Sequence, residues 1–241
     1  MRKAIQTLFA WRTFIRNQRT STGQQQLKRI FAVFRAAGTR RYDRTRDRLL
    51  RNPKFRLLLR KRGLTEALEN WQQFESYEAG TFGRAIYEFQ SSEEVDYAGL
   101  VTDFEKIGFA ANTELDRLYA ERERDMHDAI HILFGYNRTR FGEGATLLTQ
   151  YLAGGAAGYG VMYFLGIIRL CIKKPSWIKS MYKGTRAVYQ RQKGVPFREF
   201  PIENYLDQPL DTLRSVLGIS EVPHEIEVCQ RNKGWGLTYD T

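Results

Sequence analysis

The sequence is poor in cysteine and proline, and each shortage excludes a class of architecture. Its 241 residues include two cysteines, Cys171 and Cys229, which excludes a disulfide-stapled mini-protein and argues against a cysteine-based zinc site. Six widely spaced prolines and the lack of tandem repeats leave no obvious linker or repeat array. Since 42% of the residues are hydrophobic and 27% are charged, we expect a folded globular protein with a substantial core.

Acidic residues are scarce in the first quarter of the chain. Residues 1–62 contain 19 Lys/Arg against only Asp43 and Asp47, a net charge of +17, whereas the remaining 179 residues contain 19 Lys/Arg and 25 Asp/Glu, a net charge of −6. Such a segment favours an anionic surface, which could be nucleic acid, acidic lipid headgroups or an acidic protein. Nucleic acid is disfavoured as a partner, because the aromatic residues of the segment fall at helical spacing and no nucleic-acid-binding motif accompanies them.

The spacing of hydrophobic residues predicts a mainly α-helical fold. The expected helices include a basic amphipathic one at residues 24–37, one carrying the stripe from Leu64 to Phe74, a long one capped by Asn112 or Thr113, and a short one between Pro209 and Gly218. Strand signals are weak, and the best alternation is that of residues 225–228. We therefore expect a single helical domain.

The N-terminal segment is a separate question. We divide the chain into a basic amphipathic segment, residues 1–45, and a helical domain, residues 46–241. The first forty-two residues contain ten Lys/Arg and no acid, which is typical of an organelle transit peptide, although serine is scarce. The alternatives are a basic helix that belongs to the fold and a segment that contacts a membrane, with apolar residues in the interface and arginines at anionic headgroups.

Residues 145–168 form a run of 24 residues without a formal charge, which is long enough to cross a bilayer as one helix. Five glycines and three polar residues in the run weaken that interpretation and favour a helix buried in the protein. A third interpretation is a helix that lines a cavity for a long apolar ligand. Its expected lipid contacts are Leu152, Tyr159, Met162 and Tyr163.

The chain has three histidines, and two of them share one face of the long predicted helix. His127 and His131 lie four residues apart, about 40° around the helix axis, and Asp128 falls in the same sector. Glu143 follows after a stretch whose glycines suit a turn between antiparallel helices, so it can return beside them. Two imidazoles and two carboxylates suit Zn²⁺ or Fe²⁺, and the carboxylates would also accept Mg²⁺. The alternative is a solvated polar face, because this sector lies nearly opposite the apolar stripe of the same helix.

The pattern His127-Asp128-x-x-His131, followed by eleven residues and Glu143, resembles the signature of the fourth coenzyme Q (ubiquinone) biosynthesis protein, the Coq-four family. The resemblance extends roughly over residues 50–220. Its further support comes from Gly80-Thr81-Phe82-Gly83 with Tyr87 and Phe89, from Glu121-Arg122-Glu123-Arg124, from Gly142-Glu143, and from Leu213-Arg214 with Leu217-Gly218-Ile219.

The resemblance implies a helical fold in which His127, Asp128, His131 and Glu143 hold a divalent cation. It also implies a prenylated aromatic ligand, peripheral attachment to a membrane, and assembly with other quinone-biosynthesis proteins. The membrane surface would be the cytoplasmic face in a bacterium or the matrix face of the mitochondrial inner membrane. A homo-oligomer is compatible with the same pattern.

Two kinds of function follow from the resemblance. The first is enzymatic, an oxidative decarboxylation in which a hydroxyl group replaces the ring carboxylate of a prenylated hydroxybenzoate. Zn²⁺ has no accessible redox change and could act there only as a Lewis acid or a template, whereas non-haem Fe²⁺ with open coordination positions could act with O₂. The second is a non-catalytic, lipid-binding scaffold in which the metal ties two helices together.

Overall fold

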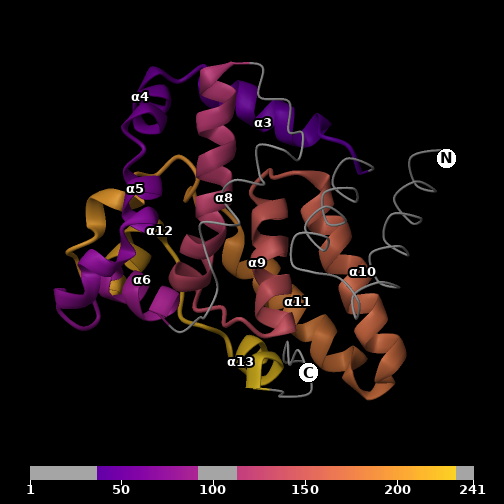
Figure 1. The fold of residues 1–241 in the computed structure, drawn as a ribbon. Helices are drawn as coiled ribbons and strands as arrows, with labels where there is room; N and C mark the ends of the chain where they lie inside the picture. Colours follow the sequence, from indigo (N-terminus) through magenta and orange to yellow (C-terminus); the bar gives the residue numbers. More distant parts are fainter. Residues whose placement is uncertain (1–36, 92–112, 232–241) are drawn as a thin grey trace, which may run out of the picture.

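The computed structural model describes residues 37–91 and 113–231 and is mainly helical, as the hydrophobic spacing predicts (Figure 1). The predicted helix at residues 24–37 lies, except for its last residue, outside the described part. The helices are α3 (Arg40–Leu50), α4 (Pro53–Lys61), α5 (Gly63–Glu69), η1 (Trp71–Ser76), α6 (Phe82–Ser91), α8 (Glu114–Phe134), α9 (Arg140–Leu152), α10 (Ala157–Lys173), η2 (Pro175–Trp177), α11 (Ile178–Gln192), η3 (Ile202–Tyr205), α12 (Leu210–Leu217) and α13 (His224–Arg231).

The long helix α8 runs through the middle of the fold (Figure 1). It begins with a capping box, in which the Thr113 hydroxyl accepts from the Asp116 N–H and the Asp116 carboxylate accepts from the Thr113 N–H, each at 3.1 Å. It ends at Gly135, whose φ of +62° is in the left-handed region that favours glycine. The predicted helix and its Thr113 cap are therefore confirmed.

Two clusters of buried side chains hold the helices together. The larger one joins α8 to α5, α6, α9, α11, α12 and α13, and it includes Phe82, Leu133, Phe141 and Val188. The smaller one lies where α3 and α4 meet the start of α8, and Tyr42 packs there on Tyr119 with ring centroids 5.2 Å apart. The predicted boundary at residue 45 falls inside α3, and Tyr42 on its N-terminal side takes part in this smaller core.

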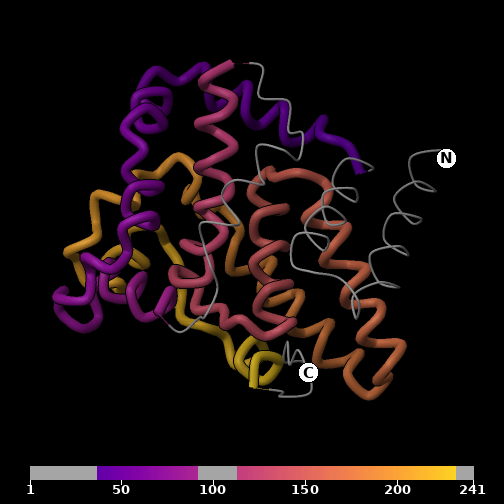
Figure 2. The backbone as a smooth tube through the Cα atoms, in the orientation of Figure 1, coloured from indigo at the N-terminus to yellow at the C-terminus, as the bar shows by residue number. Residues whose placement is uncertain are grey.

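The uncharged run of residues 145–168 forms parts of two helices, and the expectation of one continuous helix is wrong. The chain turns after α9 at Gly154, whose φ is +97°, and then continues into α10 (Figure 2). Among the helices of the described ranges, none combines a bilayer-spanning length with sufficient hydropathy. The break places a polar face of α9 against α8.

Two other expectations need correction. Residues 225–228, the best strand candidate, lie inside α13, because Ile226, Cys229 and Gln230 are spaced to bury one helical face. The stripe from Leu64 to Phe74 is interrupted at Asn70, where α5 ends before the 3-10 turn η1. The helix between Pro209 and Gly218 is confirmed as α12.

Candidate metal centre

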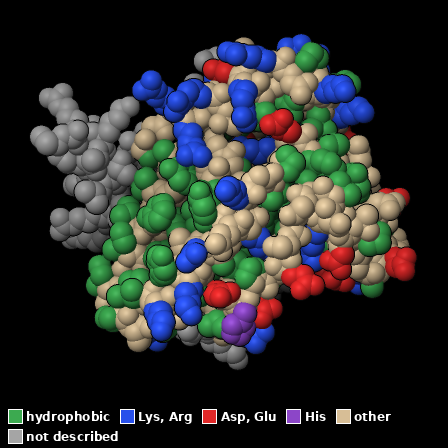
Figure 3. All heavy atoms as spheres, turned by 180° about the vertical axis from the view of Figure 1, so that it is seen from behind, with side chains coloured by type: hydrophobic (Ala, Val, Ile, Leu, Met, Phe, Trp, Pro, Cys, Tyr) green, Lys and Arg blue, Asp and Glu red, His purple; other side chains and the backbone are tan. Residues whose placement is uncertain are grey.

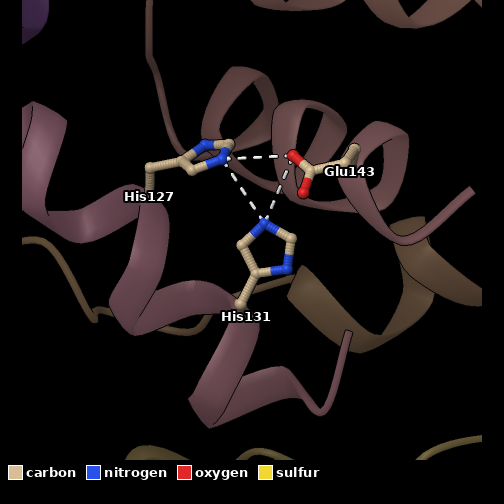
Figure 4. A group of neighbouring side chains, drawn as sticks. All are labelled: His127, His131 and Glu143. Atoms are coloured by element: carbon tan, nitrogen blue, oxygen red, sulfur yellow. Dashed lines mark hydrogen bonds and ion pairs between the residues drawn. The ribbon is translucent and has the colours of Figure 1, made fainter. Parts of the chain in front are cut away.

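Three of the predicted ligands converge between α8 and α9 (Figure 4). His127 and His131 project from α8, and their Nε2 atoms lie 3.4 Å apart. The carboxylate atom Oε2 of Glu143, from the first turn of α9, lies 3.4 Å from Nε2 of His127 and 3.5 Å from Nε2 of His131. The side chain of His131 is buried, whereas those of His127 and Glu143 remain about 30% exposed. The site is therefore partly covered by protein and is not a solvated helix face.

The local sequence explains how Glu143 reaches the histidines. Gly135 ends α8, and the Thr139 hydroxyl caps α9 by accepting from the N–H of Gly142. Gly142 packs directly on the backbone of Asn137, and a Cβ at position 142 would overlap its carbonyl oxygen. The close turn places Glu143 in the first turn of α9, beside His131.

The outer nitrogen of His131 has a backbone partner. Its Nδ1 lies 2.9 Å from the carbonyl oxygen of Tyr136. Because a carbonyl oxygen only accepts, Nδ1 carries the proton and donates it, which leaves the Nε2 lone pair directed into the site. The ring also packs on Phe89 of α6, with ring centroids 5.3 Å apart. The orientation of His131 is thus fixed by packing as well as by a hydrogen bond.

The outer nitrogen of His127 has a side-chain partner. Its Nδ1 lies 3.2 Å from Oε1 of the buried Gln150, two helical turns after Glu143 on α9. The same argument places the proton on Nδ1 and the Nε2 lone pair in the site. Both imidazoles therefore present the same kind of nitrogen to the same point.

The convergence of these atoms suits a bound cation. Two imidazole lone pairs and a carboxylate oxygen are all electron-pair donors, and at 3.4–3.5 Å they repel one another unless a proton or a metal ion lies among them. Burial by itself would raise the pKa of the Glu143 carboxyl, but the imidazoles of His127 and His131 outweigh burial and hold that pKa well below its usual range. Ligands about 2.1 Å from one tetrahedral ion lie about 3.4 Å apart, so the three residues fit a single divalent metal.

Asp128, the fourth predicted ligand, does not join this group. Its Oδ2 accepts a hydrogen bond of 3.0 Å from Nε2 of Gln90, on α6. Burial raises the pKa of its carboxyl to about 6, although the nearby imidazole of His131 and the bond from Gln90 partly oppose that effect. The structure thus brings together two imidazoles and one carboxylate, with Asp128 held beside them.

The residues predicted to contact lipid lie around the junction of α9 and α10. Tyr163 is buried, with its hydroxyl hydrogen-bonded to Thr185, and Tyr159 is buried in the smaller core. Leu152 and Met162 are half-buried against the two cores. Their role in binding lipid stays a prediction. A cavity of about 480 Å³ elsewhere, beside α11, is lined mainly by polar and charged side chains.

The sequence contains a signal for one of the residues that hydrogen-bond to the ligands. Gln150 follows Glu143 by seven residues, which places both on one face of a helix. Gln90 and Tyr136 had no such signal, because their contacts with Asp128 and His131 depend on how α6 and the turn after α8 pack.

Comparison with known proteins confirms the family resemblance predicted from the sequence. Residues 14–223 match the family described as coenzyme Q (ubiquinone) biosynthesis protein Coq4. The fold is similar to the crystal structure of a Nostoc punctiforme PCC 73102 protein described as a candidate ubiquinone biosynthesis protein, with a TM-score of 0.63 and 16% sequence identity over 90% of this chain and 99% of that one. No curated protein matches the sequence. Because the family match covers most of the chain, the protein belongs to the coenzyme Q biosynthesis protein Coq4 family.

Proposed function

We propose that this member of the Coq4 family is a metal-dependent protein of coenzyme Q biosynthesis that acts on a prenylated aromatic ring. The observation that carries the proposal is the convergence of His127, His131 and Glu143, whose nearest ligand atoms are 3.4–3.5 Å apart. Two imidazoles and one carboxylate leave coordination positions open for a substrate or O₂, as catalytic sites do. Of the metals considered, Fe²⁺ and Zn²⁺ suit this donor set better than Mg²⁺, which prefers oxygen ligands.

The proposed reaction is an oxidative decarboxylation of the ring. The bond between the ring and its carboxylate breaks, CO₂ leaves, and one oxygen atom of O₂ becomes the new ring hydroxyl. The other oxygen atom is reduced to water by two protons and by two electrons from an external reductant. Bound Fe²⁺ would supply the redox chemistry, since Zn²⁺ cannot change its oxidation state. His127, His131 and Glu143 would hold the ion, and the partial exposure of His127 and Glu143 supports access of the substrate from one side.

A prenylated substrate resides in a membrane, and one surface of the protein suits contact with anionic lipid. We call it the α10–α11 apolar surface, and Figure 3 shows hydrophobic side chains gathered there among basic ones. Its exposed apolar residues are Phe164, Ile168, Ile172, Ile178 and Tyr182, and the neighbouring exposed cations are Lys173, Lys174, Lys179 and Lys183. Apolar insertion combined with attraction to acidic headgroups is how peripheral proteins attach. The membrane face would be the bacterial cytoplasmic one or that of the mitochondrial matrix.

A second function, a non-catalytic scaffold for other quinone-biosynthesis proteins, is favoured by the position of the ligands. They join α8 to α9 at the centre of the fold, so a bound ion would also tie these helices together. Glu143→Ala separates the two functions. The scaffold predicts a destabilised fold, whereas the enzyme predicts lost turnover of a prenylated hydroxybenzoate with the fold intact.

The first test is elemental analysis of the protein after anaerobic reconstitution with Fe²⁺ or Zn²⁺. We expect near-stoichiometric metal in the wild type and in the control His224→Ala, because His224 lies at the exposed start of α13. His131→Ala and Glu143→Gln should lose most of it. Absence of metal from the reconstituted wild type would remove the basis of the proposal.

A further inference from the structure

Gln150 is buried between α8 and α9, and both ends of its side-chain amide have partners. Its Nε2 donates to the backbone carbonyl oxygen of Glu123 at 3.1 Å. Because that oxygen cannot donate, the amide nitrogen must face Glu123, and Oε1 must face His127. The direction of the amide is therefore set by the backbone of α8.

The backbone of Gln150 is held as well. Its carbonyl oxygen accepts a hydrogen bond of 3.0 Å from Nη2 of the buried Arg198, and the same guanidinium pairs with the carboxylate of Glu123. The side-chain amide cannot turn away from His127 without also breaking its buried hydrogen bond to Glu123, and a buried polar group left unpaired costs energy.

The fixed amide determines which nitrogen of His127 is a ligand. Oε1 of Gln150 only accepts, so the proton of the neutral imidazole is held on Nδ1, and Nε2 faces His131 and Glu143 with a free lone pair. In the other tautomer Nε2 would carry the proton into the site, where it would block a metal ion. His131 obtains the same result from a backbone carbonyl, which no substitution removes.

We propose that Gln150 is a positioning residue that selects the metal-binding tautomer of His127. The inference rests on the proposed metal function of the site but adds a residue that lies outside the His-Asp-His-Glu pattern. It predicts that the affinity of the site for metal depends on a side chain that does not touch the ion.

The test compares three variants of the full chain. Gln150→Met removes the acceptor while keeping a similar volume, and Gln150→Glu keeps an acceptor facing His127. Gln192→Met is the matched control, since Gln192 is a buried glutamine on α11 with no hydrogen bond to the site among the described residues. Gln150→Asn, which keeps the amide but shortens it, replaces the methionine variant if that one does not fold.

Two measurements on these variants are needed. The ¹⁵N shifts of His127 in metal-free protein at pH 8 report the tautomer, and competition titration with Co²⁺ and Zn²⁺ reports affinity. We expect the Nδ1–H form in the wild type and its loss in Gln150→Met, with metal bound roughly 10–100-fold more weakly. Gln150→Glu should recover most of the affinity, and Gln192→Met should match the wild type.

An unchanged tautomer and affinity in Gln150→Met would overturn the inference while leaving the metal site in place. If instead the wild type bound no metal, the proposed function would fail. The ¹⁵N shifts would still decide whether Gln150 sets the tautomer, because they are measured without metal.

Discussion

The two halves of the uncharged run at residues 145–168 are alike in sequence character but opposite in burial. In α9 the polar residues Thr146, Thr149 and Gln150 are all buried, at most 1% exposed. In α10 the large apolar residues Phe164 and Ile168 are 48% and 52% exposed. From hydropathy alone, the large apolar residues of α10 would be buried and the polar residues of α9 exposed. The neighbours of each helix, and not its composition, therefore decide which side chains are buried.

Those neighbours differ in a simple way. Helix α9 packs against α8, α10, α11 and α13, so almost all of its residues are buried or half-buried, and Gln150 finds hydrogen-bond partners on α8. Helix α10 packs mainly on α9 through Gly158, Tyr159, Gly160 and Tyr163, whereas Phe164, Ile168 and Ile172 of the same helix are exposed. We therefore propose that α9, which carries Glu143 in its first turn, serves the metal centre and that α10 serves the membrane contact. The following predictions test this contrast.

The largest effect is expected at the start of α9, for Gly142→Ala. A Cβ there would overlap the carbonyl oxygen of Asn137, a backbone atom that cannot move without opening the turn between α8 and α9. We expect a loss of about 3 kcal/mol or more in the free energy of unfolding, together with loss of metal binding, since Glu143 is the next residue. Urea unfolding of the metal-free chain measures the first effect. A variant as stable as the wild type would show that this turn is not tightly packed.

A slightly smaller effect is expected from Asp128→Asn in the metal-free protein. The folded-state pKa of about 6 lies above the ordinary value of 3.8, so the folded state retains the proton longer than the unfolded state does. The contribution of the protonated Asp128 carboxyl to the free energy of unfolding is complete below about pH 4 and is lost as the pH rises through 6. Asp128→Asn should remove this loss, so the free energy of unfolding of the variant at pH 7 should exceed that of the wild type by up to about 3 kcal/mol.

The measurement is urea unfolding of both proteins at pH 4.5 and pH 7. Equal pH dependence in the two proteins would contradict the prediction. Metal analysis of the same variant shows whether Asp128 is a metal ligand. If Asp128 only lies beside the site, held by Gln90, Asp128→Asn should leave metal binding largely intact. If Asp128 is a ligand, the variant should lose metal.

How far the sequence predicts this site depends on the range of each interaction. The spacing of His127 and His131 and the Thr113 cap are local to one helix, so periodicity alone locates them. The helical wheel also places Asp128 near His131, but its carboxylate is taken up by Gln90 from another helix. The break at Gly154 depends on a backbone conformation that a neutral, glycine-containing run does not specify. Contacts between helices therefore mark the limit of the sequence argument.

The next prediction tests the role of α10 through a substitution on the α10–α11 apolar surface. Ile172 is 74% exposed, and Ile172→Asp should weaken binding to vesicles containing acidic lipid by roughly 10–100-fold, the equivalent of one buried isoleucine. Vesicle co-sedimentation at constant salt measures it. The control is Val216→Asp on α12, which replaces another exposed apolar residue, 53% exposed, outside this surface. Equal losses in both variants would contradict the assignment.

The smallest effect is expected at Gly166, in the middle of α10. It distinguishes α10 from α9 most directly. A Cβ at Gly166 meets nothing within 4 Å, in contrast to Gly142. Because glycine is about 1 kcal/mol less favourable than alanine inside a helix, Gly166→Ala should stabilise the protein by up to about 1 kcal/mol, measured as a higher urea midpoint at an unchanged m-value. Metal binding should not change. If Gly166→Ala were instead destabilising, another part of the protein would have to pack against α10 at this point, and the surface we assign to the membrane would be smaller than its exposed residues indicate.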